Sequence, residues 1–114
     1  MVNIRIEEYS SAVIICLKGE FMFESVLFAE QVWDEQRRTG HSVIAVDCSE
    51  LDFIDSSAIG ILVKFLNQSK NAGIDMVFLD PSDSVMPIFK TARLESFFTF
   101  MNRKEFFDQY VQGA

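Results

Sequence analysis

The fold of this 114-residue chain is decided by Val43-Ile44-Ala45-Val46, then Asp47-Cys48-Ser49-Glu50-Leu51-Asp52-Phe53-Ile54, then Asp55-Ser56-Ser57. The first, unbroken apolar run predicts a strand that is buried on both faces of a sheet. We interpret residues 47–54 as a short acidic loop. Apolar residues at helical spacing follow the serines, namely Ile59, Leu62, Val63 and Leu66. The stretch therefore predicts a buried strand, a loop and an amphipathic helix that continues to about residue 72.

The predicted helix begins at Asp55-Ser56-Ser57, because aspartate and serine are favoured N-cap residues. A hydroxyl at this strand-to-helix corner would lie at the positive end of a helix dipole, where negative charge is stabilised. Capping alone explains most serines at helix starts. Here Gly60 also lies in the first turns, where glycine costs about 1 kcal/mol relative to alanine. Its presence predicts that another backbone or a binding partner comes close.

The composition is that of one compact domain spanning residues 1–114, with 49% hydrophobic residues. A net charge of −7 argues against binding to nucleic acid or to an anionic membrane surface. We expect a cytosolic protein without membrane insertion, since no run is long enough to span a bilayer and the N-terminus lacks signal-peptide features. Cys16 and Cys48 stand in apolar, strand-like contexts and are predicted to be small core residues.

The rest of the chain alternates between predicted strands and helices. Residues 3–8 predict an exposed strand with Ile4 and Ile6 facing inward and with Arg5 and Glu7 nearer solvent. Residues 12–18 predict a second, buried strand that ends at Gly19 and completes a hairpin. A helix is predicted at 23–38, with Gly40 as its C-cap. A strand at 74–79 and a turn at 80–83 lead into a short helix with Pro87 in its first turn. The last predicted elements are a strand at 97–101 and a helix at 103–111. This order predicts an α/β fold: a mixed sheet of about five strands with about four helices.

The topology also predicts where function lies. Strands joined by a helix should run parallel with a right-handed crossover, so strands 12–18 and 43–47 end at the same edge of the sheet. Residues 19–23, 50–57 and 80–84 should therefore form one continuous surface. In open α/β sheets this edge usually carries the functional site.

Several chemistries are excluded by the residues that they require. His41 is the only histidine and precedes the strand that leads to Ser56, so no base stands near that hydroxyl. The G-x-S-x-G elbow and the phosphate-binding glycine loops are missing. We therefore expect neither catalysis nor a cofactor. A phospho-aspartate receiver domain would need an acidic pair after its first strand, whereas Glu7-Glu8 leads into a hairpin.

A divalent cation is a further alternative at the acidic residues of 47–55. Clustered carboxylates can bind such an ion. We favour a solvated acidic loop and no metal site; the carboxylates concerned are Asp47, Glu50, Asp52 and Asp55.

The segment 46–60, which reads VDCSELDFIDSSAIG, closely resembles the signature of the STAS domain family. This family is named for sulfate transporters and anti-sigma factor antagonists, and the resemblance extends over essentially the whole chain. It implies an anti-sigma factor antagonist that acts in bacterial transcription regulation by partner switching. The unphosphorylated form would bind an anti-sigma factor, which is a serine kinase, and free the sigma factor. Phosphorylation of Ser56, or of Ser57 as the fallback acceptor, would abolish binding, and a serine phosphatase is a further candidate partner.

Two residues depart from the pattern of the family. Ala58 stands where the family often has glycine, and Met22 stands where it commonly has aspartate. Since the loop of Met22 should flank Ser56, a different partner or a different regulation stays open. The predicted sheet edge and the resemblance together give the candidate partner-binding residues, which are Glu20, Phe21, Met22, Phe23, Asp52, Phe53, Ile54, Asp55, Ser56, Ser57, Ala58 and Gly60.

A phosphate on Ser56 would add roughly −1.5 to −2 charges at neutral pH. The free N–H groups and the dipole of the helix could accommodate it without a change of fold. If the partner is acidic, or if it must approach closely over Gly60, the charge of the phosphate would prevent binding. We therefore predict a surface-electrostatic switch and not a conformational one.

The apolar residues after Gly19 support a second hypothesis. Met22, Val26, Ala29 and Trp33 suit one core-facing stripe, but Leu27 and Phe28 lie off it, and Phe21 and Phe23 add to the excess. One interpretation is a deep core. The other is an exposed patch around Phe21–Phe28 that serves a homodimer or an apolar partner, as in a non-signalling STAS subunit associated with a transporter or acting as a scaffold.

Overall fold

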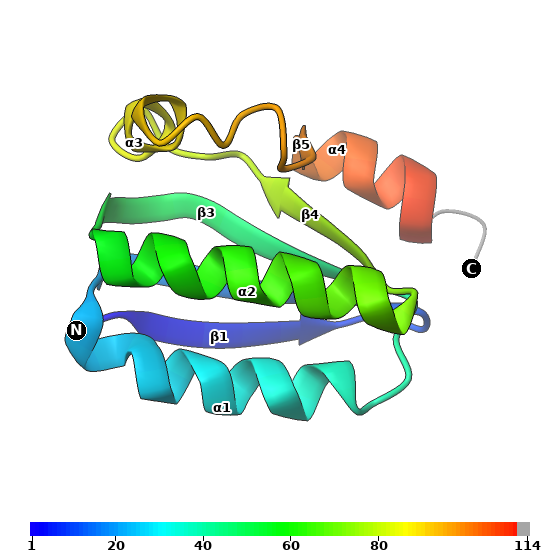
Figure 1. Cartoon of the computed structure of the whole chain (residues 1–114). Coiled ribbons are helices and arrows are strands. Elements are labelled where there is room, and N and C mark those ends of the chain that lie inside the picture. Colours follow the sequence, from blue (N-terminus) through cyan, green and yellow to red (C-terminus); the bar gives the residue numbers. More distant parts are fainter. Residues whose placement is uncertain (112–114) are drawn as a thin grey trace.

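The computed structural model describes residues 1–111, which form one five-stranded sheet in the order β1-β2-β3-β4-β5 (Figure 1). The hairpin partner β1 (Asn3–Glu8) runs antiparallel to β2 (Ala12–Phe21). The central strand β3 (Val43–Ile54) runs parallel to β2 and to β4 (Asp75–Leu79), and β4 also pairs in parallel with β5 (Phe100–Met101). The predicted mixed sheet and the parallel pairing of the second and third strands are confirmed.

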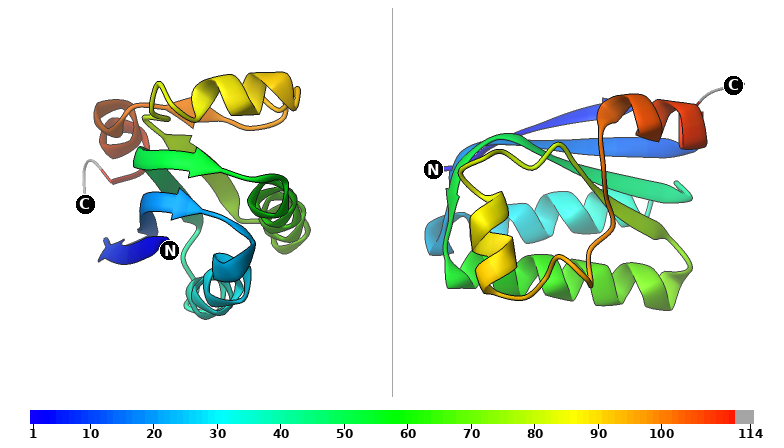
Figure 2. Two further views of the ribbon diagram at one scale, coloured as in Figure 1. Left: turned by 90° about the vertical axis from the view of Figure 1, so that its left-hand side faces the viewer. Right: turned by 90° about the horizontal axis from the view of Figure 1, so that it is seen from above.

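Helices cover both faces of the sheet (Figure 2). The short 3₁₀ turn η1 (Phe23–Ser25) leads into α1 (Val26–Arg37), which lies beside α2 (Ser56–Ala72) on one face. The larger core lies there and also buries Phe89 of α3 (Met86–Thr91), and Trp33 stacks on Phe65 with ring centroids 4.5 Å apart. On the other face, α4 (Arg103–Phe106) and the π-helical turn η2 (Phe107–Val111) cover a smaller core. Figure 2 shows α4 across the sheet from α1 and α2.

The segment 47–54 is not a loop, and Gly19 does not end β2. Both predictions were wrong, because β2 and β3 stay paired as far as Phe21 and Ile54 through two register shifts. One of these shifts lies between Gly19 and Glu20, and Gly19 has a φ of 94°. A glycine with positive φ lets a bulge form without ending a strand. The extension carries both strands out to the predicted functional edge.

The predicted inner face of β1 was also wrong in part. Ile6 is exposed, whereas Glu7 is partly buried because it forms an ion pair with Arg103 at the start of α4. Helix α1 ends at Arg37 with Arg38 as its C-cap, so Gly40 follows the cap instead of forming it.

The strand predicted at 97–101 is formed only at Phe100–Met101, and the helix predicted from residue 23 begins as the 3₁₀ turn η1, whereas the predictions for Pro87 and the two cysteines are confirmed. Pro87 lies at the start of α3, where its missing N–H costs nothing. Cys16 and Cys48 are buried free thiols, and burial raises the pKa of the Cys16 thiol to about 11 and also raises the pKa of the Cys48 thiol. Both thiols therefore stay protonated at neutral pH. Within residues 1–111, no helix combines the length and the apolar character needed to cross a bilayer.

Candidate functional site

Asp55 organises the corner between β3 and α2. Its carboxylate accepts a hydrogen bond from the Ala58 N–H at 2.9 Å, which makes it the N-cap of α2. The second carboxylate oxygen accepts from the Phe23 N–H at 3.0 Å, and the Asp55 N–H donates to the Phe21 carbonyl at 3.2 Å. One side chain thus fixes both the start of α2 and the chain that leaves β2.

The predicted functional edge is formed as one surface. Glu20 pairs with Phe53 and Phe21 with Ile54 where β2 and β3 end. The left view of Figure 2 shows the ends of these two strands side by side. On the other side of β3, the Ser82 hydroxyl donates to the Leu51 carbonyl at 2.6 Å and its N–H donates to the Cys48 carbonyl at 3.3 Å. The segment that follows β4 is thereby held against β3, and the three predicted segments lie side by side.

The structure places the predicted site residues in two groups. Ser56 is exposed and Ser57 is half-buried at the first turn of α2. The other residues at least partly open to solvent are Glu20, Met22, Phe23, Asp52, Phe53, Asp55 and Gly60. Three side chains are buried in the core and can support this surface only from beneath, and these are Phe21, Ile54 and Ala58.

Gly60 meets open space within the chain. A Cβ placed on it would meet nothing within 4 Å, so no other part of the described chain requires a glycine there. Gly60 follows Ser56 by one helical turn, and residues four apart in a helix lie on the same face. A binding partner could therefore approach the helix backbone closely, directly beside the Ser56 hydroxyl.

Large apolar side chains are exposed around this edge. Phe23 is 74% exposed and Leu27 is 75% exposed, while Phe28 and Phe53 are about half as open. A deep core does not explain these residues, so the excess of apolar residues after Gly19 forms surface. Phe21, by contrast, is only 1% exposed and belongs to the core.

An apolar groove of about 320 Å³ lies between α2 and α3. Ile59 of α2 forms one side of it, and Pro87, Ile88, Thr91 and Ala92 of α3 form the other. Ile59 is three residues from Ser56, so the groove adjoins the serine. No local pattern along the chain indicates this groove, because the packing of α3 against α2 is set by contacts distant along the chain.

The charge of the edge is uniformly negative. The segments 19–24, 50–57 and 80–84 contain no lysine, arginine or histidine, and they carry the carboxylates of Glu20, Glu24, Glu50, Asp52, Asp55, Asp80 and Asp83. Lys18 lies 3.8 Å from Glu50 and offsets one of these charges. Among residues 1–111, no group of three His, Cys, Asp or Glu side chains is arranged to hold a metal ion, so the alternative cation site is not formed there.

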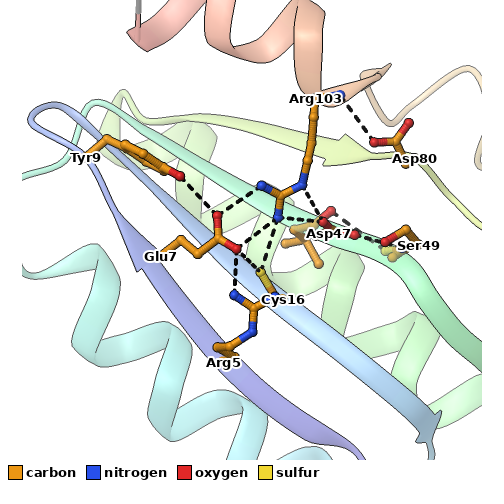
Figure 3. Close-up of polar contacts among 10 residues, drawn as sticks. Arg5, Glu7, Tyr9, Cys16, Asp47, Ser49, Asp80 and Arg103 are labelled. Carbon is orange, nitrogen blue, oxygen red and sulfur yellow. Dashed lines mark hydrogen bonds and ion pairs between the residues drawn. The ribbon is translucent and has the colours of Figure 1, made fainter.

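Asp47 is not part of a solvated acidic loop, which corrects our interpretation of it. It is buried and accepts hydrogen bonds from the Arg103 guanidinium at 2.8 and 3.0 Å (Figure 3). The same guanidinium donates to both Glu7 oxygens at 3.0 and 3.2 Å. These hydrogen bonds from Arg103 lower the pKa of Glu7 from 4.5 to about 2, and they raise the pKa of Arg103.

This ion-pair network joins β1, β3 and α4 on the sheet face opposite α1 and α2 (Figure 3). Arg103 lies 56 residues from Asp47 and 96 residues from Glu7. No local spacing could have indicated these contacts. We assign the network a structural role, because it fastens the C-terminal helix to the sheet.

His41 lies at the far end of β3 from Ser56. Its imidazole Nε2 is 3.1 Å from the Glu8 carboxylate, and its Nδ1 contacts the Thr39 hydroxyl. The only histidine of the chain is thus remote from Ser56, and the candidate site presents an exposed serine at the N-terminus of α2, flanked by apolar and acidic side chains.

Solved structures with the same fold include anti-sigma factor antagonists. The unphosphorylated form of the antagonist SpoIIAA matches with a TM-score of 0.79 at 21% identity, covering 98% of each chain. A putative anti-sigma factor antagonist from Thermotoga maritima matches with a TM-score of 0.84 at 21% identity, covering 94% of this chain and 93% of the other. The phosphorylated form of the Bacillus SpoIIAA matches with a TM-score of 0.73 at 19% identity, covering 94% and 98%.

No curated protein matches the chain. The model of the STAS domain family, however, matches residues 3–108, which include both strands of the functional edge and the whole of α2. The chain belongs to the STAS domain family.

Proposed function

We propose that this protein is an anti-sigma factor antagonist that switches partners through Ser56. In its unphosphorylated form it binds an anti-sigma factor with serine kinase activity and so releases the sigma factor. Phosphorylation of Ser56 by that kinase ends the binding. The protein acts by docking in the cytoplasm and not by catalysis, and a serine phosphatase would restore the binding form.

The exposed position of Ser56 at the first residue of α2 carries this proposal. A kinase must reach the hydroxyl, and the helix N-terminus can then hold the added phosphate. Ser57 is less open and is the fallback acceptor. The fold of this chain matches SpoIIAA in both its unphosphorylated and its phosphorylated form, which supports a switch that leaves the fold intact.

Phosphate incorporation tests the proposal. Wild type, Ser56→Ala and Ser57→Ala are each incubated with ATP and with every candidate anti-sigma factor kinase of the source organism. We expect one kinase to phosphorylate wild type and Ser57→Ala but not Ser56→Ala. Equal incorporation into wild type and Ser56→Ala would reject Ser56 as the acceptor.

A second candidate function is that of a non-signalling STAS interaction subunit, associated with a transporter or acting as a homodimeric scaffold. The exposure of Phe23 and Leu27 favours it, because exposed apolar patches commonly mark protein contacts. Light scattering over a range of concentrations tests the homodimeric form of this candidate, since a strict monomer at high concentration would exclude it.

A further inference from the structure

Phe23 and Leu27 form an exposed apolar ridge at the start of α1. The two side chains are 74% and 75% exposed, and they are four residues apart where η1 continues into α1. Both side chains are therefore open to solvent within six residues of the end of β2. Side chains of this size are usually placed in water together only where a partner covers them.

The ridge borders the Ser56 corner. The Phe23 N–H donates to Asp55, the residue before Ser56. Farther along the helix pair, Lys64 of α2 donates to Glu30 of α1 at 2.7 Å. Leu27 precedes Glu30 by three residues and Gly60 precedes Lys64 by four, so both lie one turn before this ion pair on the same side. Gly60 therefore lies on the same side of the helix pair as Leu27, and a Cβ there would meet nothing within 4 Å.

Charge decides between the two kinds of occupant for this surface. Glu20 and Glu24 flank the ridge, Asp52 lies nearby, and all three are exposed. A second copy of the chain would bring the same carboxylates against themselves, because a two-fold contact is self-complementary. Like charges facing each other across an interface cost several kcal/mol, whereas a partner with lysine or arginine around its binding pocket would gain affinity and association rate.

Resting on the function proposed above, we propose that Phe23 and Leu27 insert into an apolar, basic-rimmed pocket of the same anti-sigma factor that contacts Ser56. The partner's backbone approaches over Gly60, and its basic rim faces Glu20 and Glu24. The ridge supplies most of the affinity, as a few central aromatic and aliphatic residues do in many interfaces.

This arrangement explains how a phosphate could block a basic partner. Ser56 directly follows Asp55, which accepts a hydrogen bond from the Phe23 N–H, and Gly60 follows Ser56 by one helical turn. A phosphate on Ser56 would be enclosed by the bound partner at the point of closest approach. The free-energy cost of removing water from the phosphate would exceed the electrostatic attraction to the distant positive charges of the partner.

Calorimetric titration of the full chain with each purified candidate anti-sigma factor kinase tests the proposal. We expect Phe23→Ser/Leu27→Ser and, separately, Gly60→Leu to weaken binding at least about tenfold. Thermal melts should stay near that of wild type, since these positions are exposed. The matched control is Phe97→Ser: Phe97 is 63% exposed and lies near Lys70, about 20 Å along α2 from Ser56. It should bind as wild type does.

The rim is tested by Glu20→Lys/Glu24→Lys, which should weaken binding and reduce its dependence on salt. Glu35→Lys is the control, because Glu35 is exposed in the second half of α1. If the ridge variants bind a kinase as tightly as wild type does, the inference is wrong while the proposed function stands. If no kinase binds wild type, the proposed function fails and the inference falls with it. A wild-type dimer that Phe23→Ser/Leu27→Ser converts to a monomer would show that a second copy covers the ridge, which overturns the inference.

Discussion

The carboxylate of Asp55 joins two segments, because one oxygen accepts from the Phe23 N–H at 3.0 Å while the other caps α2. Asp55 thus positions Ser56 relative to the ridge of Phe23 and Leu27. The residue directly before the proposed phosphate acceptor is thus a structural part of the proposed docking surface.

Replacing Asp55 with alanine should remove the N-cap and release the Phe23 backbone. We expect a loss of about 1–2 kcal/mol in the free energy of unfolding, as for other N-cap deletions. Urea denaturation measures the change. Asp55→Asn is the control, since its amide oxygen can still cap the helix, and an equal loss in both variants would show that charge and not capping is decisive.

The Arg103 network should stabilise the packing of α4 on the sheet. Arg103→Ala removes the guanidinium from buried Asp47, which then keeps the Ser49 N–H as a donor to its other oxygen, and the loss should cost about 2 kcal/mol. Arg5 also contacts Glu7, but its side chain is 57% exposed, so Arg5→Ala should change stability by less than about 0.5 kcal/mol. Urea denaturation of both variants checks this contrast, and equal losses would contradict it.

The free energy of unfolding should decrease in acid because Glu7 becomes protonated. Its pKa is lowered from 4.5 to about 2 in the folded protein, so the unfolded chain binds this proton first as the pH falls. The contribution is complete above about pH 5 and is lost as the pH falls toward 2, and it amounts to at most about 3 kcal/mol. Denaturation at pH 7 and pH 3 should show a smaller pH dependence for Glu7→Gln than for wild type. The same pH dependence in both would assign the acid sensitivity to other groups.

Phosphorylation of Ser56 should leave the fold unchanged. We expect amide shifts in the NMR spectrum to be confined to the first turns of α2 and to the adjacent ends of β2 and β3. Wide shifts across the sheet, including β1 and β4, would instead indicate a conformational switch.

The sequence predicted those parts of the fold that depend on local signals. The apolar run at 43–46 and the cap at Asp55 indicate a buried strand and a helix start because short stretches carry the physical cause. The end of β3 was missed, because the pairing with β2 continues past Gly19 through bulges that no local pattern reports.

The position of the candidate site was predictable from local signals, but the burial of its side chains was not. The motif placed Ser56 correctly at the start of α2, but Phe21, Ile54 and Ala58 proved to be core residues. Asp47 appeared to be one carboxylate of a solvated loop, because its partner Arg103 comes from the far end of the chain. Sequence alone also could not decide whether the apolar residues after Gly19 were core or surface, since this depends on where α2 packs against α1.

The affinity of the cognate anti-sigma factor for this protein before and after phosphorylation of Ser56 tests the central claim most directly. Calorimetric titration should give tight binding for the unphosphorylated protein and at least about a hundredfold weaker binding for the phosphorylated protein, with a melting temperature that stays within a few degrees. Equal affinity of the two forms would contradict the claim that the charge at this one position controls docking.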